Sequence, residues 1–231
     1  MKTKINMPQW VEDNTFQIHY IYTKFIEVGF KYTHDLEFLD SLFLDVFKKY
    51  SSKGRHYHTM THIYRLCRNW SRFKHKLNNK DAVFFAIIYH DIIYKPTKKD
   101  NEEMSAEYFL TLAMRKKFDA DIAFIQNVVD LIKITKHGSE NSEFIKLNKD
   151  FKYMLDFDLE IIGEPKKEIY NWYREGVRKE YRIYPNFLYK PGRKAVLESF
   201  LKNKIYLTEE FKIREKNAKK NLQNEINLYL C

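Results

Sequence analysis

The sequence predicts an all-α protein. Its 231 residues include only 6 Gly and 5 Pro, whereas a β-sandwich or barrel needs many tight turns and uses more of both. Lys, Glu, Leu and Ile are abundant, and no segment alternates apolar and polar residues with the period of a strand. With 44% hydrophobic residues the chain can bury a sizeable core, so these observations favour a helical bundle.

Helices are predicted in order along the first half of the chain. Residues 36–49 carry a helical apolar stripe, and residues 57–76 form a second helix after the turn at 51–54. Residues 80–94 are apolar nearly all round, which predicts a helix at the centre of the domain. A fourth helix begins at Asp100, which is a suitable N-cap residue.

The second half of the chain continues the pattern. Helices are expected over 121–137, which is followed by Gly138, and over 151–162, which is followed by Gly163. Pro165 opens a helix that runs to about residue 184. Pro185 and the Pro191–Gly192 pair bracket a stretch expected to be irregular, and the final helices are predicted over 192–203 and 208–228.

The composition also limits the cellular location and the binding partners that we expect for the protein. The two cysteines, Cys67 and Cys231, cannot form a CxxC clamp and are expected to be free thiols in a reducing compartment. The N-terminus meets acidic residues before any long apolar run, and the longest apolar stretch, 82–89, is too short to span a bilayer. We therefore expect a cytoplasmic protein with no membrane association. The formal net charge of +10 favours phosphate-bearing partners.

Histidine and aspartate residues gather at three separated places. The pair His90–Asp91 ends the apolar helix, His62 lies four residues after His58 on a predicted helix, and Asp156 and Asp158 follow downstream. A buried Asp beside a His is unfavourable unless positive charge compensates it, and a metal ion supplies that charge. Imidazole and carboxylate ligands suit divalent Mn, Fe, Co, Ni or Zn, and Mg is a further candidate. Two aspartates two residues apart on a helix point in different directions, so only one of them is expected to be a ligand.

The motifs resemble those of the HD superfamily, whose signature is a His, an adjacent His-Asp pair and a distant Asp. YHTMTHI at 57–63 is similar to the YHNxxHA segment of cyclic nucleotide phosphodiesterases. The closer similarity is to a family of metal-dependent HD phosphohydrolases of unassigned substrate. It covers nearly the whole chain after residue 55, in the segments RHYHTMTHI, YHDIIY, DNEEMSAEYF, LIKITKH, MLDFDLEIIG, VRKEY and PGR.

The resemblance implies a single HD-type phosphohydrolase domain over 1–231 with N- and C-terminal helical extensions. It implies one or two divalent metal ions per chain, held by four ligands: His62, His90, Asp91 and Asp158. Asp158 is preferred to Asp156 because Asp158–Leu159 matches the Asp-Leu that bears the last ligand in the phosphodiesterases. The expected catalytic residues are Asp91 and His58, the latter as general acid. Thr59 stands where the phosphodiesterases have Asn, which weakens the inference of a cyclic nucleotide substrate.

Two further residues are predicted to bind substrate. His137 ends a predicted helix, where it either stabilises the helix dipole or faces a phosphate or a second metal. Arg178, in the VRKEY segment, either clamps a phosphate or pairs with Glu175 or Glu180.

The predicted function is hydrolysis of a phosphoester by metal-activated water. The expected substrate is a nucleotide or another small phosphoester, and the basic charge also allows an oligonucleotide. Two alternatives stay open: a di-iron oxygenase on the same fold, and a basic nucleic-acid-binding protein that retains the metal pocket for structure.

Overall fold

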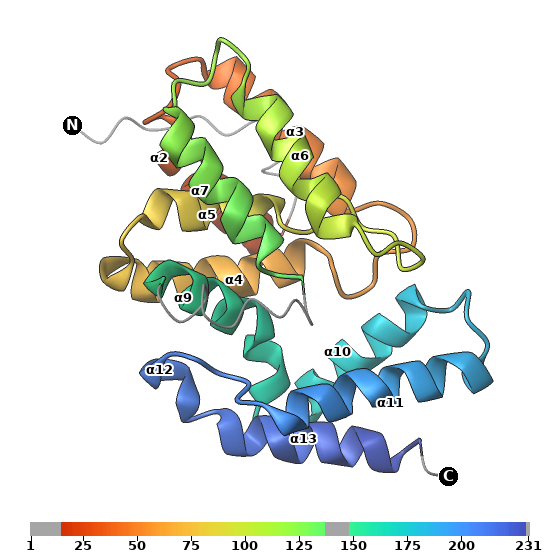
Figure 1. Ribbon diagram of the computed structural model, residues 1–231. Coiled ribbons are helices and arrows are strands. Elements are labelled where there is room, and N and C mark those ends of the chain that lie inside the picture. The colour runs from red at the N-terminus through yellow and green to blue at the C-terminus, as the bar shows by residue number, and fades with distance from the viewer. Residues whose placement is uncertain (1–14, 137–147, 230–231) are drawn as a thin grey trace.

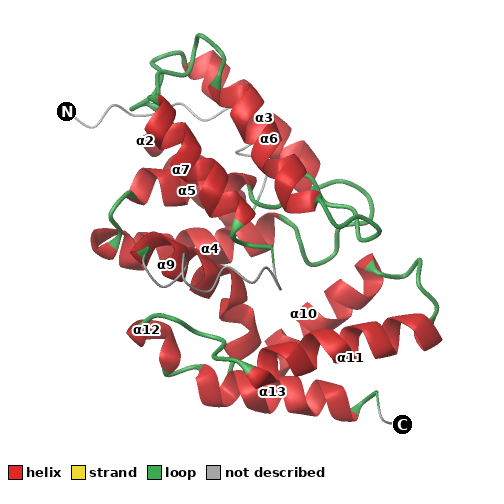
Figure 2. Cartoon of the chain, in the orientation of Figure 1, coloured by secondary structure: helices red, strands yellow, loops and turns green. Residues whose placement is uncertain are grey.

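The computed structural model describes residues 15–136 and 148–229, and all regular structure in those ranges is helical (Figures 1 and 2). The all-α prediction is therefore confirmed. The α-helices are α2 (Phe16–Gly29), α3 (Leu36–Tyr50), α4 (Met60–Phe73), α5 (Lys80–Tyr89), α6 (Asn101–Ala113), α7 (Ile122–Lys133), α9 (Lys149–Asp158), α10 (Lys167–Glu180), α11 (Asn186–Lys202), α12 (Glu209–Lys212) and α13 (Glu215–Asn227). Two 3₁₀ turns, η1 (Lys74–Lys76) and η2 (Leu159–Gly163), extend α4 and α9.

Helix α5 lies at the centre of the bundle, as its sequence predicts. The Asn79 side chain caps its N-terminus by accepting a hydrogen bond from the Ala82 backbone N–H. Every residue from 82 to 89 is buried, and α4, α7 and α9 pack against the helix. Burial on all sides explains why this segment shows no polar stripe.

Helix α5 ends five residues before the predicted boundary at 94. The backbone N–H of Ile93 donates to the Ser105 hydroxyl, and the backbone N–H of Lys95 donates to the Asn101 side chain. Side chains of α6 thus bind the backbone groups that would otherwise continue the helix. Because α5 stops at Tyr89, His90 and Asp91 follow at its C-terminal end.

The C-terminal part of the chain forms a separate group of helices around α10, α11 and α13, below the bundle in the view of Figure 1. The prediction of an irregular stretch at 185–192 is wrong, because α11 begins at Asn186 and includes Pro191. Pro191 lies in the exposed second turn, where the missing N–H removes a single intrahelical hydrogen bond.

A buried charged cluster holds these C-terminal helices together. The Arg193 guanidinium on α11 donates to the Glu225 carboxylate on α13 (2.9 Å) and to the Tyr173 hydroxyl on α10 (2.9 Å). Tyr170 and Tyr229 donate their hydroxyl protons to the same carboxylate, over 2.6 and 2.9 Å. We call these five residues the Arg193–Glu225 cluster.

Within residues 15–136 and 148–229 no helix combines the length and the apolar character needed to cross a lipid bilayer.

Candidate metal centre

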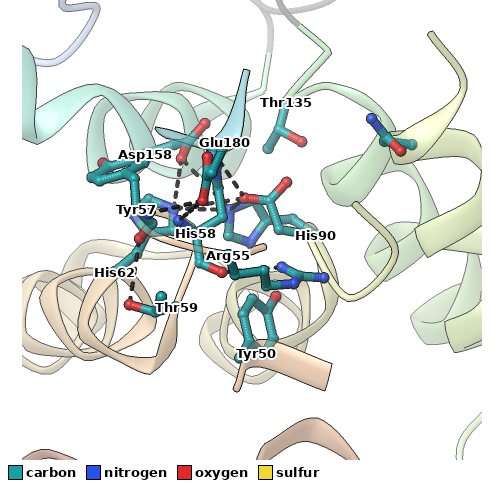
Figure 3. A network of polar contacts seen from close by, with 12 residues as sticks. Tyr50, Arg55, Tyr57, His58, Thr59, His62, His90, Thr135, Asp158 and Glu180 are labelled. Carbon is teal, nitrogen blue, oxygen red and sulfur yellow. Dashed lines mark hydrogen bonds and ion pairs between the residues drawn. The ribbon is translucent and has the colours of Figure 1, made fainter. Parts of the chain in front are cut away.

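Three helices bring His62, His90 and Asp158 to one point. His62 lies in the first turn of α4, His90 directly follows α5, and Asp158 is the last residue of α9. Both imidazoles are 1% exposed, and one ligand atom from each of the three residues lies within 4.8 Å of the others. Figure 3 shows the three side chains pointing toward one another.

The separations of these atoms match the edges of a metal coordination sphere. Two ligands held about 2.1 Å from one cation, at about 90 to 109° from each other, lie about 3.0 to 3.4 Å apart. The Nε2 atoms of His62 and His90 are 3.3 Å apart. An oxygen of Asp158 lies 3.2 Å from Nε2 of His62 and 3.5 Å from Nε2 of His90. The residues therefore fit a divalent cation both in chemistry and in spacing.

Asp91 lies beside this set. Its Oδ2 is 3.2 Å from Nε2 of His90, 3.8 Å from Nε2 of His58 and 3.9 Å from Nε2 of His62. Burial alone would raise the pKa of Asp91, but the neighbouring His90 and His58 hold it well below its usual value. A negative oxygen surrounded by three imidazoles can complete the coordination of a cation from a second side.

The His90 ring is oriented by the backbone. Its Nδ1 lies 3.0 Å from the Ile87 carbonyl, so Nδ1–H donates there and Nε2 faces the carboxylates. Burial would lower the pKa of His90, but Asp91 and Asp158 raise it well above its ordinary value. The two carboxylates thus stabilise positive charge at this point, which a divalent cation would also supply.

The two neighbouring aspartates of α9 have different surroundings. Asp156 is fully buried, and its carboxylate accepts hydrogen bonds from the backbone N–H groups of Leu207 (2.8 Å) and Thr208 (2.7 Å) and from the Thr208 hydroxyl. It anchors the 207–208 segment. Asp158 turns to the histidines instead, as expected for residues two apart on a helix.

His58 lies outside α4, which corrects the expectation that His58 and His62 share a helix. Helix α4 begins at Met60, and residues 56–59 before it form bends. The Glu180 carboxylate at the end of α10 accepts hydrogen bonds from the backbone N–H groups of residues 56, 57 and 58, at 2.8 to 2.9 Å. These bonds replace the helical hydrogen bonds of that segment. His58 still reaches the centre, with its Nε2 directed toward Asp91.

Glu180 also binds the His58 ring. Its Oε2 lies 2.7 Å from Nδ1 of His58, and the Glu180 side chain is fully buried (Figure 3). Burial would raise the pKa of Glu180, but His58 and the backbone donors lower it to about 2. Burial lowers the pKa of His58, while Glu180 and Asp91 raise it more, so its pKa lies above the ordinary value.

The motif analysis did not identify Glu180, although it lies in the same VRKEY segment as Arg178. The available signal was helical spacing. Glu180 follows Val177 by three residues and Tyr173 by seven, so it continues the buried face of α10. A Glu on such a face needs a partner inside the protein.

Gly176 on the same helix lets α10 approach the His58 segment closely. A Cβ at residue 176 would lie 3.0 Å from the Tyr57 Cβ and 3.2 Å from the His56 carbonyl oxygen. The close approach allows Glu180, one turn later, to reach three backbone donors.

Arg55 fixes the other side of this segment. Its guanidinium donates to the backbone carbonyls of His58 (3.1 Å) and Ile92 (3.0 Å) and lies over the rings of Tyr50 and Tyr94. It therefore joins the segment that carries His58 to the segment that follows His90–Asp91.

Three of the four metal-ligand candidates line a cavity of about 720 Å³. His58, His90, Asp91 and Asp158 line it, and so do Tyr94 and Glu102. A cavity of this size accommodates a small organic ligand.

Neither predicted substrate-binding residue is among the described residues that line this cavity. His137 lies outside the described residues. The Arg178 guanidinium donates to the backbone carbonyls of Tyr181 (3.0 Å) and Tyr184 (3.2 Å) and covers the Tyr189 ring, and the residue does not line the cavity. The Arg178 side chain thus binds backbone carbonyls just beyond the end of α10. These carbonyls have no hydrogen-bond partner within the helix.

Comparison with models of known protein families, with curated proteins and with solved structures gave no match. The resemblance to HD phosphohydrolases accordingly stays a prediction from the motifs.

Proposed function

We propose that this chain is a metal-dependent hydrolase of phosphoesters. The observation that carries the proposal is the convergence of His62, His90 and Asp158, with Asp91 beside them, at the wall of a ligand-sized cavity. Motifs from distant parts of the chain meet at this point.

A divalent cation bound by these residues supplies a Lewis acid for phosphate oxygens and lowers the pKa of a water molecule toward neutrality. His62, His90 and Asp158 would hold it, and Asp91 would complete the set. His90 is kept in the right orientation by the Ile87 carbonyl.

His58 is the proposed general acid. Its Nε2 faces the cavity beside Asp91, and its Nδ1 is bound by Glu180. The proton on Nε2 passes to the ester oxygen as the bond between phosphorus and that oxygen breaks. Glu180 keeps Nδ1 protonated and the ring oriented, so Nε2 is the nitrogen that exchanges protons with the substrate.

Lysines at the cavity rim support an anionic substrate. Lys98 and Lys99 are exposed and line the cavity just before α6. Together with the net charge of +10, they attract phosphate groups toward the centre.

The test combines a metal measurement with an activity measurement on one sample. Purified protein, loaded with Mn²⁺ or Co²⁺, is expected to hydrolyse members of a panel of nucleotides and alkyl and aryl phosphates. His62→Ala should lower both the bound metal and kcat/KM, the latter by more than about a thousandfold.

His75→Ala is the matched control, because His75 is exposed in η1 and lies outside the centre. Its metal content and activity should equal those of the wild type. Full activity in His62→Ala would contradict the proposal. Two irons per chain together with oxygen uptake would instead support an oxygenase.

A further inference from the structure

The cavity next to the metal centre has one polar side and one apolar side. The polar side comes from the metal-centre residues, from the segment that leads into α6 with its first turn, and from the residues just after α7. Its residues beyond that centre are Lys98, Lys99, Asn101, Glu102, Thr135 and Lys136. Charged and metal-binding groups on this side suit the phosphate.

The apolar side comes from one face each of α10 and α11. On α11, Leu188, Gly192, Val196 and Phe200 recur every four residues and all line the cavity. On α10 and just beyond it, the cavity is lined at the matching spacing by Tyr173, Val177, Tyr181 and Tyr184. Two helices thus present largely apolar and aromatic faces to the same space, and Arg193, which lines it beside them, is paired with Glu225 and Tyr173.

Part of this apolar face is exposed rather than packed in the core. Leu188 is 55% exposed and Val196 is 45% exposed, while Leu197, the neighbour of Val196, is fully buried. A ligand that covers Leu188 and Val196 removes apolar surface from water, which favours binding. A purely hydrophilic ligand would gain nothing there.

We propose that the substrate is a phosphoester whose ester group is apolar or aromatic, seated against the α10–α11 face while its phosphate faces the metal centre. This inference rests on the proposed function for the reaction, but the apolar site makes its own prediction about binding. A cavity of about 720 Å³ has room for both parts of such a molecule.

The test compares esters that differ only in the apolar group. Ethyl phosphate and 2-phenylethyl phosphate release alcohols of similar acidity, so their intrinsic reactivity is nearly equal. With the Mn²⁺-loaded protein, kcat/KM should be at least about tenfold higher for the phenylethyl ester. The non-hydrolysable ethylphosphonate and 2-phenylethylphosphonate should show the same order of affinity in calorimetric titration.

Two variants locate the effect. Val196→Asp places a charge on the cavity face of α11 and should reduce the affinity ratio of the two phosphonates to less than about threefold. Ala195→Asp introduces the same side chain at the adjacent exposed position, which does not line the cavity, and should leave the ratio unchanged. Equal metal content in both variants shows that the fold is intact.

The outcomes separate the two proposals. Equal affinities for the two phosphonates, or no binding of either, would overturn the inference about the apolar group. Discrimination between the phosphonates without cleavage of any ester would uphold that inference and count against the hydrolase. If Val196→Asp and Ala195→Asp lower the affinity ratio of the two phosphonates equally, the apolar group does not bind at the α11 face.

Discussion

Two buried clusters of charged groups contact α10, and their composition differs. In the Arg193–Glu225 cluster a guanidinium faces a carboxylate directly, and tyrosine hydroxyls fill the remaining acceptor positions. Around the metal centre, the ion-pair partners of Asp91 within the described part of the chain are three imidazoles. Imidazoles carry charge only when protonated.

The difference indicates what each cluster is for. Arg193 and Glu225 satisfy one another, so their cluster is complete as a structural link between α10, α11 and α13. The candidate metal centre brings carboxylates and the ring nitrogens of His62 and His90 to ligand spacing, an arrangement that could hold a divalent cation. Burial of charge alone therefore does not indicate a metal site, whereas imidazole partners at ligand spacing favour one.

The largest predicted effect is on metal binding and activity, and it should distinguish the two aspartates of α9. Asp158→Asn is expected to lower bound metal and to reduce kcat/KM by more than about a thousandfold, because a proposed ligand is lost. Asp156→Asn should retain metal and destabilise the fold by about 1 to 3 kcal/mol, because the donors of Leu207 and Thr208 lose their acceptor. Metal analysis and urea unfolding measure the two effects; metal loss in Asp156→Asn alone would reverse the assignment.

The sequence predicted much of this arrangement and missed a specific part of it. His90 ends a strongly apolar helix, where a polar pair is conspicuous, and the resemblance of the motifs to HD phosphohydrolases added His62 and Asp158 as expected ligands. Glu180 is different, because it contacts His58 across 122 residues of sequence. The position of one helix end against a distant loop depends on tertiary packing, which one sequence does not specify.

Local rules also failed where tertiary contacts replaced them. Pro191 indicated a break, yet α11 runs through it. The segment of His58 had helical spacing, yet Glu180 binds the backbone N–H groups that a helix would need. Arg178 was predicted to bind phosphate because of its guanidinium, but that guanidinium donates hydrogen bonds to the backbone carbonyls that follow α10.

The second prediction tests the structural cluster. Arg193→Met leaves the Glu225 carboxylate buried without its cation and should lower the free energy of unfolding by about 3 to 5 kcal/mol. Metal content should stay at the wild-type value. The double variant Arg193→Met/Glu225→Leu should recover part of the loss, and failure to destabilise in Arg193→Met would show that the cluster is not a structural link.

The third prediction uses Glu180, which joins the end of α10 to the segment that carries His58. Its pKa is about 2 in the folded protein against an ordinary value of 4.5, so the folded state binds this proton less readily than the unfolded chain. The carboxylate therefore contributes stability above pH 4.5, up to about 3 kcal/mol, which is lost as the pH falls toward 2. Glu180→Gln should flatten the fall in unfolding free energy between pH 5 and pH 2; an unchanged slope would contradict the assigned ion pair.

The most direct test of the central claim is a crystal structure of the Mn²⁺-loaded protein with anomalous scattering data. We expect an anomalous peak within about 2.0 to 2.3 Å of Nε2 of His62, Nε2 of His90 and an oxygen of Asp158. Metal bound elsewhere, or full loading of the chain with no peak among these three residues, would contradict the claim.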